Sequence, residues 1–427
     1  MTSAVKGEVS MVASARGAPK PLKSLDDALA ELLKSAIPLG RIDDVATFDA
    51  DRRVLAMDVI SELQVPPHDN SSMDGYALRC ADVVQLNAVL PISQRIAAGS
   101  SGEALQGGTA ARIFTGAPIP EGADAVVMQE DCIVMTSPQG IPQIQVNTNP
   151  KPGLWIRRSG EDVIKGAVVL SKGDRLSPAS LGLAASVGLD RLRVAAAPRV
   201  ALFSTGDELV MPGDVLPAHM RPGAIYNSNR FFLRALLVRL GCAVTDFGIV
   251  PDRLDATLDA LRTASAEHDL ILTSGGVSVG EEDHIKPAVQ TLGELNLWQI
   301  AIKPGKPFAY GKVGAAHFIG LPGNPVSSFI TFLILVRPFL LQLQGARDLT
   351  APSVAIPAHF DWPKADKRRE FLRVRRNAKG GLDLFPNQSS GVLTSAVSGD
   401  GVVDNPPGRA IAQGDTVQFI AFSDLLS

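Results

Sequence analysis

Residues that could bind phosphate and a metal ion lie together between positions 273 and 286. The segment TSGGVSVGEEDHIK directly follows an apolar run, residues 270–272, which predicts a buried strand. A strand that opens into a Gly-Gly pair and then reaches a helix near Asp283 presents backbone amides and a helix N-terminus to one point, which favours an anion. The acids at 281–283 supply the oxygen ligands that a hard divalent cation prefers. The backbone groups expected at the anion belong to Ser274, Gly275, Gly276 and Ser278. An ordinary strand-to-helix turn is the alternative interpretation.

Two further loops carry residue types suited to the same chemistry. KPGKPFAYGK places Lys303 and Lys306 on either side of a Pro-Gly pair, so a stiff loop could hold two ammonium groups apart for phosphate or another oxyanion. A solvated loop explains the two lysines equally well. LPGNP, with Pro322 and Pro325, predicts a rigid turn before a helix that could shape a pocket wall.

Other polar clusters have both a structural and a functional interpretation. STGDEL follows a strand, and Thr205 to Glu208 suit a helix N-cap or the ligation of a hydrated metal. DNSSMDGYA puts Asp74 before Gly75, which is a turn signal, although its carboxylate could reach a neighbouring site. Thr115 ends a strand in RIFTGAPIP, and RRSGED gathers charges that include Asp162 on a turn. Both are compatible with an interface or with surface turns.

The composition is that of a soluble globular protein with several domains. The chain has 427 residues, 45% hydrophobic and 20% charged, with a net charge of −3, which gives no case for binding nucleic acid or an anionic membrane. Its three cysteines are widely spaced and lack any CxxC pair, so a reducing, cytoplasmic location is expected. Residues 1–21 are small and polar and are expected to form a disordered leader.

The pattern of elements predicts a multidomain α/β plus β protein. Leu25 to Ala36 carries apolar residues at helical spacing after Ser24, which predicts an amphipathic helix. Between 196 and 342, apolar strands alternate with amphipathic helices, which indicates a mostly parallel sheet. The expected domains are a linking domain (22–77 and 151–195), an inserted β domain (78–150), the α/β domain (196–342) and a small, barrel-like C-terminal β domain (350–427).

Three polar motifs of the α/β domain begin where a strand is predicted to end. They are STGDEL, TSGGVSVGEED and LPGNP. Ligands of such sheets bind beyond the carboxyl ends of the strands, so the three loops are expected to converge on one edge. The fingerprints HExxH, GxxxxGK[ST] and GxGxxG are missing from the sequence, which argues against a zinc hydrolase and the usual nucleotide-binding folds.

Together these motifs resemble those of the molybdopterin molybdenumtransferase family, which comprises bacterial MoeA and the gephyrin E-domain. The resemblance runs from about residue 22 to the C-terminus and rests on eight segments in family order: DNSSMDGYA, RIFTGAPIPEGADAVVMQE, RRSGED, STGDEL, IYNSN, TSGGVSVGEED, KPGKPFAYGK and GLPGNPVSS. It implies a four-domain homodimer with its active site between subunits. It also implies insertion of molybdate into adenylylated molybdopterin, with release of AMP and of molybdenum cofactor.

The resemblance also implies roles for particular residues. The functional acids of the family fall on Asp74, Asp162, Glu208, Asp252 and Asp283, together with Thr115, and its pocket prolines fall on Pro322 and Pro325. Glu208 and Asp283 would hold Mg²⁺, and Ser274 to Gly280 with Lys303 and Lys306 would hold phosphate or molybdate. A transient contact with molybdopterin adenylyltransferase is also expected.

Two alternatives stay open at this stage. The related molybdopterin adenylyltransferase resembles residues 196–342, but it lacks the flanking β domains and the DNSSMDGYA loop. A non-catalytic scaffold like gephyrin is the other alternative, although no additional fused domain is visible in this chain.

Overall fold

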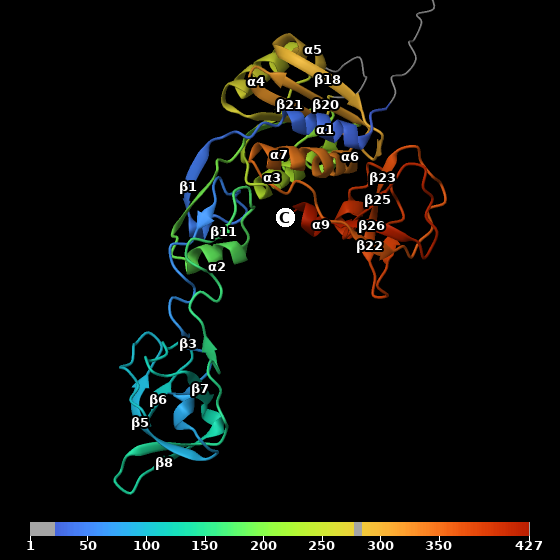
Figure 1. The fold of residues 1–427 in the computed structure, drawn as a ribbon. Coiled ribbons are helices and arrows are strands. Elements are labelled where there is room, and N and C mark those ends of the chain that lie inside the picture. Colours follow the sequence, from blue (N-terminus) through green and yellow to red (C-terminus); the bar gives the residue numbers. More distant parts are fainter. Residues whose placement is uncertain (1–21, 277–283, 427) are drawn as a thin grey trace, which may run out of the picture. The chain divides into compact units, whose positions relative to one another are not determined.

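The computed structural model describes residues 22–276 and 284–426, which group into two compact units. The α/β unit combines residues 22–39, 197–344 and 348–426, and the β unit combines residues 40–196 and 345–347. Figure 1 labels the elements of both units. The helix predicted at the N-terminus forms as α1 (Leu25–Ser35), with the Ser24 hydroxyl accepting from Asp27 N, and it belongs to the α/β unit.

The α/β unit is built on a six-stranded, mostly parallel sheet, as predicted. Its strands lie in the order β16 (Ala243–Val250), β13 (Arg199–Thr205), β17 (Leu270–Ser274), β21 (Ala316–Leu321), β20 (Pro307–Val313) and β18 (Gly293–Gln299). The first four run parallel, and β20 runs antiparallel to both of its neighbours. The carboxyl ends of β13, β17 and β21 therefore meet at one edge.

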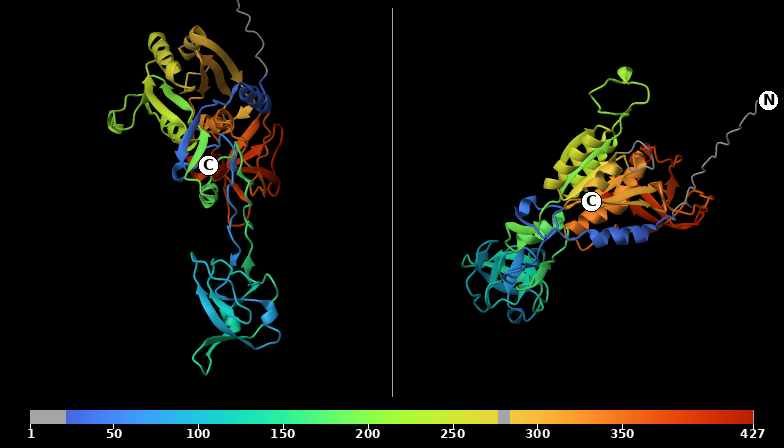
Figure 2. Two further views of the ribbon diagram at one scale, coloured as in Figure 1. Left: turned by 60° about the vertical axis from the view of Figure 1, so that its left-hand side comes forward. Right: turned by 90° about the horizontal axis from the view of Figure 1, so that it is seen from above.

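Helices cover both faces of this sheet, which is why its central strands β13, β17 and β21 are buried along almost their whole length. Ala201 and Phe203 of β13 pack in one core with Leu261 of α4 (Leu254–Glu267) and Ile285 of α5 (Ile285–Leu292). The contacts of α3 (Asn229–Arg239) and α6 (Pro325–Thr331) with each other and with the strands place these two helices on the opposite face. The segment between β14 (Leu209–Val210) and β15 (Ile225–Tyr226), with η4 (Pro217–His219), extends away from the sheet (Figure 2).

One continuous helix of 19 residues, Pro325–Leu343, is apolar and long enough to cross a membrane by length and composition. It comprises α6, η5 (Phe332–Val336) and α7 (Arg337–Leu343). Because 83% of its most apolar window is buried inside the protein, this segment matches the core helix of a soluble protein.

The C-terminal sheet includes one strand from outside the C-terminal region. Its order is β19 (Ile302–Lys303), β23 (Arg369–Arg376), β25 (Gly401–Asn405), β26 (Thr416–Ala421) and β22 (Val354–Pro357), with β24 (Leu382–Leu384) paired to β23. The short helices α8 (Thr394–Ser398) and α9 (Phe422–Leu426) pack on it. The sequence placed residues 302–303 in the α/β domain, but their hydrogen bonds join the C-terminal sheet.

The β unit contains a six-stranded sheet and a set of short strand pairs. The sheet order is β7 (Ala125–Met128), β4 (Gly75–Leu78), β6 (Ala110–Ile113), β5 (Ala88–Ile96), β9 (Pro142–Val146) and β8 (Cys132–Thr136). The pairs are β1 (Ile42–Ala46) with β12 (Arg191–Ala195), β2 (Val59–Ile60) with β11 (Val168–Leu170), and β3 (Asn70–Ser71) with β10 (Ile156–Arg157). The chain before the inserted sheet therefore pairs with the chain after it, next to helix α2 (Pro178–Ser186).

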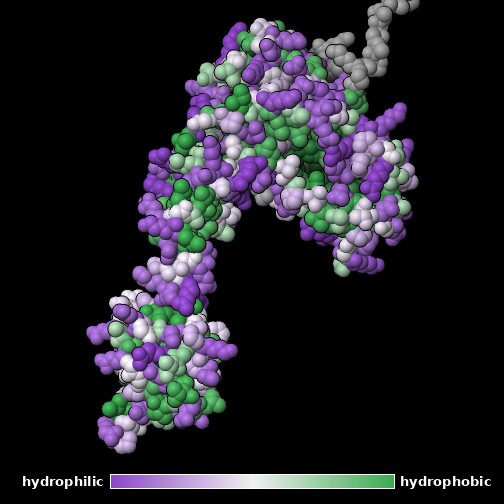
Figure 3. Space-filling model, in the orientation of Figure 1, coloured by the Kyte–Doolittle hydropathy of each residue, from purple (hydrophilic) through white to green (hydrophobic). Residues whose placement is uncertain are grey.

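The visible surfaces of both units mix hydrophilic and hydrophobic residues (Figure 3). Exposed large apolar side chains such as Phe48, Val84 and Val397 are scattered along the chain and belong to different elements. Scattered apolar residues of this kind are normal on a soluble protein.

Candidate functional site

A cleft of about 410 Å³ lies at the carboxyl edge of the α/β sheet. Loops that follow β13, β17 and β21 line it, so the predicted convergence of the three polar motifs is confirmed. The predicted site residues that the structure brings together here are Thr205, Glu208, Ser274, Gly275, Pro322 and Pro325. LPGNP forms the predicted rigid turn, with Pro325 as the first residue of α6.

The Gly-Gly pair at the end of β17 is required by the close approach of β13. Gly275 has φ +96°, and a Cβ there would lie 2.7 Å from the Thr205 carbonyl oxygen. Gly276 has φ +69°, and a Cβ there would lie 2.6 Å from Ile285 Cγ1. A side chain at either position would be strained; at Gly275 it would push β17 away from β13, and at Gly276 it would displace Ile285 of α5. These two glycines therefore allow β13, the end of β17 and α5 to approach one another closely beside the cleft.

STGDEL does not begin a helix. After Thr205 the chain turns at Gly206 and enters the short strand β14, which pairs in parallel with β15. The interpretation as a helix N-cap is therefore wrong, because these residues join a strand pair that carries the projecting segment. The exposed side chain of Glu208 folds back over Gly206, where a Cβ would lie 2.5 Å from Glu208 Oε2.

Asn229, the first residue of α3, ties two of the cleft loops together. Its Nδ2 donates to Ser274 Oγ at 2.7 Å and to the Gly323 carbonyl oxygen at 2.7 Å, and the residue is 7% exposed. Asn229 lies in the IYNSN segment, but no role was predicted for it from the sequence. An asparagine at a helix start suggests a cap, but here the amide group joins loops that follow β17 and β21.

Two buried polar atoms in the cleft have no hydrogen-bond partner among residues 22–276 and 284–426. They are Thr205 Oγ1 and Asn227 Nδ2, on residues that are 8% and 2% exposed. An unpaired buried polar atom costs about 1–3 kcal/mol, so few persist without a purpose. Both residues line the cleft, so the two unpaired atoms lie beside it.

The two lysines of KPGKP are in different environments. Lys303 Nζ lies 3.0 Å from Glu370 Oε1 and 3.4 Å from Asp366 Oδ2, so its charge is already paired within the C-terminal sheet. Lys306 is exposed, and no ion pair joins it to the described part of the chain. The next residue, Pro307, lines the cleft.

The remaining predicted residues of the α/β unit lie outside the lining of the cleft or outside the described residues. Asp252 is half-buried in the loop between β16 and α4 and does not line the cleft. The neighbouring Arg253 turns to Asp255, with Nη2 2.6 Å from Oδ2, and this ion pair and hydrogen bond lower the pKa of Asp255 to about 2. Asp283 and Ser278 lie outside the described residues.

In the β unit, Asp74 and Thr115 form a hydrogen-bonded pair. Asp74 Oδ1 accepts from Thr115 N at 2.8 Å and from Thr115 Oγ1 at 2.7 Å. The backbone bond first, and then the hydroxyl bond, lower the pKa of the Asp74 carboxyl below its usual value. Asp74 is therefore ionised at neutral pH, and its second oxygen faces no partner that the structure records.

The predicted Asp-Gly turn at this position is wrong. Gly75 begins strand β4, between β6 and β7, and a Cβ there would lie 2.0 Å from the Val127 carbonyl oxygen. Close packing in the middle of a sheet, and not a turn, requires this glycine. It also brings Asp74 to the end of a central strand, opposite Thr115.

Asp162 is exposed in the same unit, and its N–H donates to the Val65 carbonyl oxygen at 2.9 Å. The RRSGED turn that carries it is fixed by Asp69, a residue that the sequence analysis did not select. Asp69 accepts from Ser159 N at 2.8 Å and from Arg158 Nη1 at 2.6 Å, and these bonds lower its pKa. Asp74, Thr115 and Asp162 thus belong to the β unit, whereas the cleft belongs to the α/β unit.

Within the described residues, no group of three His, Cys, Asp or Glu side chains could hold a metal ion by itself. Glu208 is the carboxylate that lines the cleft. Mg²⁺ is commonly held by one or two carboxylates together with phosphate oxygens of a substrate. The donor set therefore suits a cation that arrives with a phosphorylated ligand.

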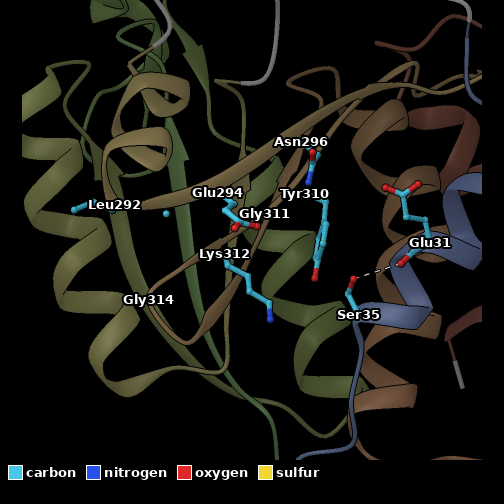
Figure 4. A pocket seen from close by; sticks show the side chains of 10 residues that line it. Glu31, Ser35, Leu292, Glu294, Asn296, Tyr310, Gly311, Lys312 and Gly314 are labelled. Carbon is cyan, nitrogen blue, oxygen red and sulfur yellow. Dashed lines mark hydrogen bonds between the residues drawn. The ribbon is translucent and has the colours of Figure 1, made fainter.

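A larger cavity of about 540 Å³ lies elsewhere, between α1, the edge strand β18 and its neighbour β20 (Figure 4). Tyr310 and Lys312 of β20, Glu294 of β18 and Ser35 of α1 face it. None of the predicted site residues lines it, and it does not lie at the carboxyl ends of the parallel strands. We therefore regard the smaller cleft as the candidate site.

Comparisons with known proteins cover nearly the whole chain. Residues 23–188 match the MoeA N-terminal region (domain I and II), residues 201–342 a probable molybdopterin binding domain, and residues 355–422 the MoeA C-terminal region (domain IV). A molybdopterin molybdenumtransferase of Haemophilus influenzae is 39% identical, over 94% of this chain and 99% of its own. A molybdopterin molybdenumtransferase of Nostoc is 35% identical, over 86% of this chain and 85% of its own. The crystal structure of a molybdopterin biosynthesis moeA protein from Pyrococcus horikoshii covers 94% of this chain and 100% of its own, with a TM-score of 0.81 and 28% identity.

Proposed function

Since this chain belongs to the MoeA family of molybdopterin molybdenumtransferases, we propose that it inserts molybdate into adenylylated molybdopterin. In this reaction the adenylate is hydrolysed, and AMP and molybdenum cofactor are released. The chain is thus an enzyme of molybdenum cofactor biosynthesis, and molybdate is its substrate.

The observation that carries this proposal is the cleft with its two unpaired buried polar atoms. Thr205 and Asn227, which carry these atoms, line a space of about 410 Å³ that is large enough for part of a cofactor-sized ligand. A pterin has ring nitrogens and a carbonyl oxygen that can pair with such groups, and the rigid Pro322 and Pro325 wall offers it an apolar surface. The backbone at Gly275, which lines the cleft, suits the adjoining phosphate.

Charge at the reacting phosphate is balanced by residues around the cleft. We assign Lys306 to phosphate or molybdate, together with the backbone of Ser274, Gly275, Gly276 and Ser278, whereas the charge of Lys303 is already paired with Glu370. Glu208 and Asp283 would hold Mg²⁺, which when bound supplies positive charge beside the pyrophosphate that is attacked.

Asp74 is suited to orient a water or the dithiolene end of the substrate. One of its oxygens is saturated by Thr115, and the low pKa of its carboxyl makes it a weak base but a stable anion. This role requires the β unit to reach a cleft. In the proposed homodimer it reaches the cleft of the other subunit, and Asp162 and Asp252 would complete that arrangement.

The proposed location is the cytoplasm, which agrees with three cysteines that form no disulfide bond. There, a transient contact with the adenylyltransferase would supply the substrate.

The test is to incubate the purified chain with adenylylated molybdopterin, molybdate and Mg²⁺, and to measure AMP and active cofactor. Asp74→Ala and Asp283→Ala are expected to abolish AMP release while the melting temperature stays unchanged. Asp51→Ala, which removes an exposed carboxylate of the β unit, is the matched control and is expected to keep full turnover. Unchanged turnover in either site variant would refute its assignment. Consumption of ATP on free molybdopterin would instead indicate the adenylyltransferase, and conversion of neither substrate would favour a scaffold.

A further inference from the structure

The loop from Lys303 to Pro307 connects two different sheets. At one end, β19 pairs in parallel with the start of β23, with Ile302 opposite Arg369 and Lys303 opposite Glu370. At the other end, Pro307 begins β20 of the α/β sheet and lines the cleft. The position of the loop is therefore set jointly by the C-terminal sheet and the α/β sheet.

Glu370 is the buried group at the C-terminal end of this connection. Its side chain is 1% exposed, and Oε1 accepts from Lys303 Nζ at 3.0 Å. Its other oxygen, Oε2, accepts from Trp362 Nε1 at 2.8 Å and from Asn405 Nδ2 at 3.4 Å. A carboxylate removed from water in this way needs its cationic partner, because an unpaired buried charge is strongly destabilising.

The charges around Lys303 balance without any ligand. Asp366, the second carboxylate near Lys303, is held by Arg368 through two hydrogen bonds of 3.0 and 2.8 Å. Arg368 therefore compensates Asp366, and Lys303 compensates Glu370. The Lys303 ammonium also lies 5.6 Å from the centre of the Trp362 ring, so its surroundings favour a fixed position.

Lys306 differs from Lys303 in each of these respects. Lys306 is exposed, and no carboxylate of the described residues forms an ion pair with it. It follows Gly305, which has φ +110° and packs so tightly on α6 that a Cβ would lie 2.2 Å from Thr331 Oγ1. The backbone before Lys306 is thus fixed, while its side chain is available.

We propose that Glu370 is a positioning residue, which anchors the 303–307 loop through Lys303 so that Lys306 binds the anion. This rests on the proposed function, because the anion is the molybdate or phosphate of that reaction. It differs from the sequence prediction, in which Lys303 and Lys306 both hold the anion. The C-terminal sheet thereby contributes to the site through a residue that touches no substrate.

The test uses the full-length protein, with molybdate alone as the probe. For each variant, calorimetry measures the dissociation constant of molybdate, and thermal unfolding measures the melting temperature. Lys306→Ala is expected to weaken molybdate binding about tenfold at an unchanged melting temperature, as for loss of one charge-assisted bond. Lys303→Met is expected to lower both the melting temperature and the affinity, because it leaves Glu370 unpaired.

The deciding variant replaces both partners, Lys303→Met with Glu370→Gln. The glutamine removes the unpaired charge but keeps an oxygen that accepts from Trp362 and Asn405, so this variant is expected to regain most of the melting temperature and of the molybdate affinity. If it regains its melting temperature but binds molybdate as weakly as Lys306→Ala, then Lys303 contacts the anion and the proposal is wrong. If it does not regain its melting temperature, the anchoring role as stated is wrong.

Glu370→Gln is a second and milder variant, because an amide oxygen can still accept from Trp362. It is expected to raise the dissociation constant for molybdate several-fold with little change in the melting temperature, whereas a general loss of structure would lower the melting temperature. Asp400→Asn is the matched control, because this carboxylate accepts from Arg376 N at the far end of β23. It is expected to leave molybdate binding unchanged, and weaker binding in it equal to that in Glu370→Gln would overturn the proposal.

These measurements separate this proposal from the proposed function. Binding of molybdate and thermal unfolding require no turnover, so the anchoring role can hold even if the wild type releases no AMP. A wild type that releases AMP while Lys303→Met keeps full stability and affinity would leave the function intact and refute the anchor.

Discussion

Replacement of Asn229 by aspartate tests whether the cleft depends on a single amide group. The substitution keeps the shape of the side chain but removes Nδ2, which donates to Ser274 Oγ and Gly323 O at 2.7 Å each. The Ser274 hydroxyl can rotate and donate to the new carboxylate, so that bond is replaced. The Gly323 carbonyl cannot donate and would face a negative charge at hydrogen-bond distance.

The expected loss follows from these two contacts. One buried carbonyl loses its donor, which costs about 1–3 kcal/mol, and repulsion from the carboxylate adds to this. The loops after β17 and β21 would then separate, and a displacement of about 1 Å in a positioned site lowers the rate about 10²-fold. We therefore expect Asn229→Asp to lower the free energy of unfolding by about 2 kcal/mol and kcat/KM by about two orders of magnitude.

Urea unfolding and AMP release from adenylylated molybdopterin measure the two quantities. Asn296→Asp makes the same chemical change at an exposed position on β18 and serves as the control, with both quantities near those of the wild type. A normal unfolding midpoint together with normal kcat/KM in Asn229→Asp would refute the view that this amide holds the cleft together.

Three further outcomes are expected. Thr115→Val should raise the pKa of the Asp74 carboxyl only part of the way to its usual value, because the backbone bond is the larger cause of its depression; carbon-13 NMR titration measures this, and an unchanged pKa would contradict it. Burial, and then the charge of Lys312, lower the pKa of His317 to about 4. The unfolded chain therefore binds the extra proton first, and folding stability should fall as the pH drops from about 6.5 towards 4. This slope should be flatter in His317→Gln when unfolding is followed by urea titration at each pH, and an equal slope would refute the assignment. Gly75→Ala should destabilise the β unit by more than about 3 kcal/mol, since its methyl group would overlap the Val127 backbone, and a normal melting curve would contradict this.

The main elements of the α/β unit could be predicted because their signals are local and periodic. Helix α1 has a serine cap and apolar residues at helical spacing, and β17 begins with the apolar run 270–272. Parallel strands place their carboxyl ends together, so the convergence of STGDEL, TSGG and LPGNP followed from the order of the elements. The division into four domains was predicted from changes in the pattern of apolar and turn residues along the sequence. The contacts within the structure group the chain into two units.

The errors concern residues whose environment is set by distant parts of the chain. Asp74-Gly75 has the local signal of a turn, but the glycine is there because β7 passes within 2.0 Å of its missing Cβ. Strand β19 has two residues, too few for any periodicity, and the partner of Lys303 is 67 positions away in sequence. No pattern in KPGKP distinguishes a paired lysine from an available one. The bond from Asn229 to Gly323 spans 94 positions and was invisible for the same reason.

The membership of β19 in the C-terminal sheet has a consequence for synthesis of the chain. All six strands of the α/β sheet have left the ribosome once residue 321 has emerged, so that sheet can form early. The segment at 302–303 must then wait for Arg369 and Glu370 before it acquires its neighbour. A nascent chain, or a fragment cut before residue 369, would therefore have the cleft, but the 303–307 loop would lack the β23 strand that fixes its position. Competence to bind the anion would arise late, when translation nears its end, and a prematurely terminated product would be folded in part but inert.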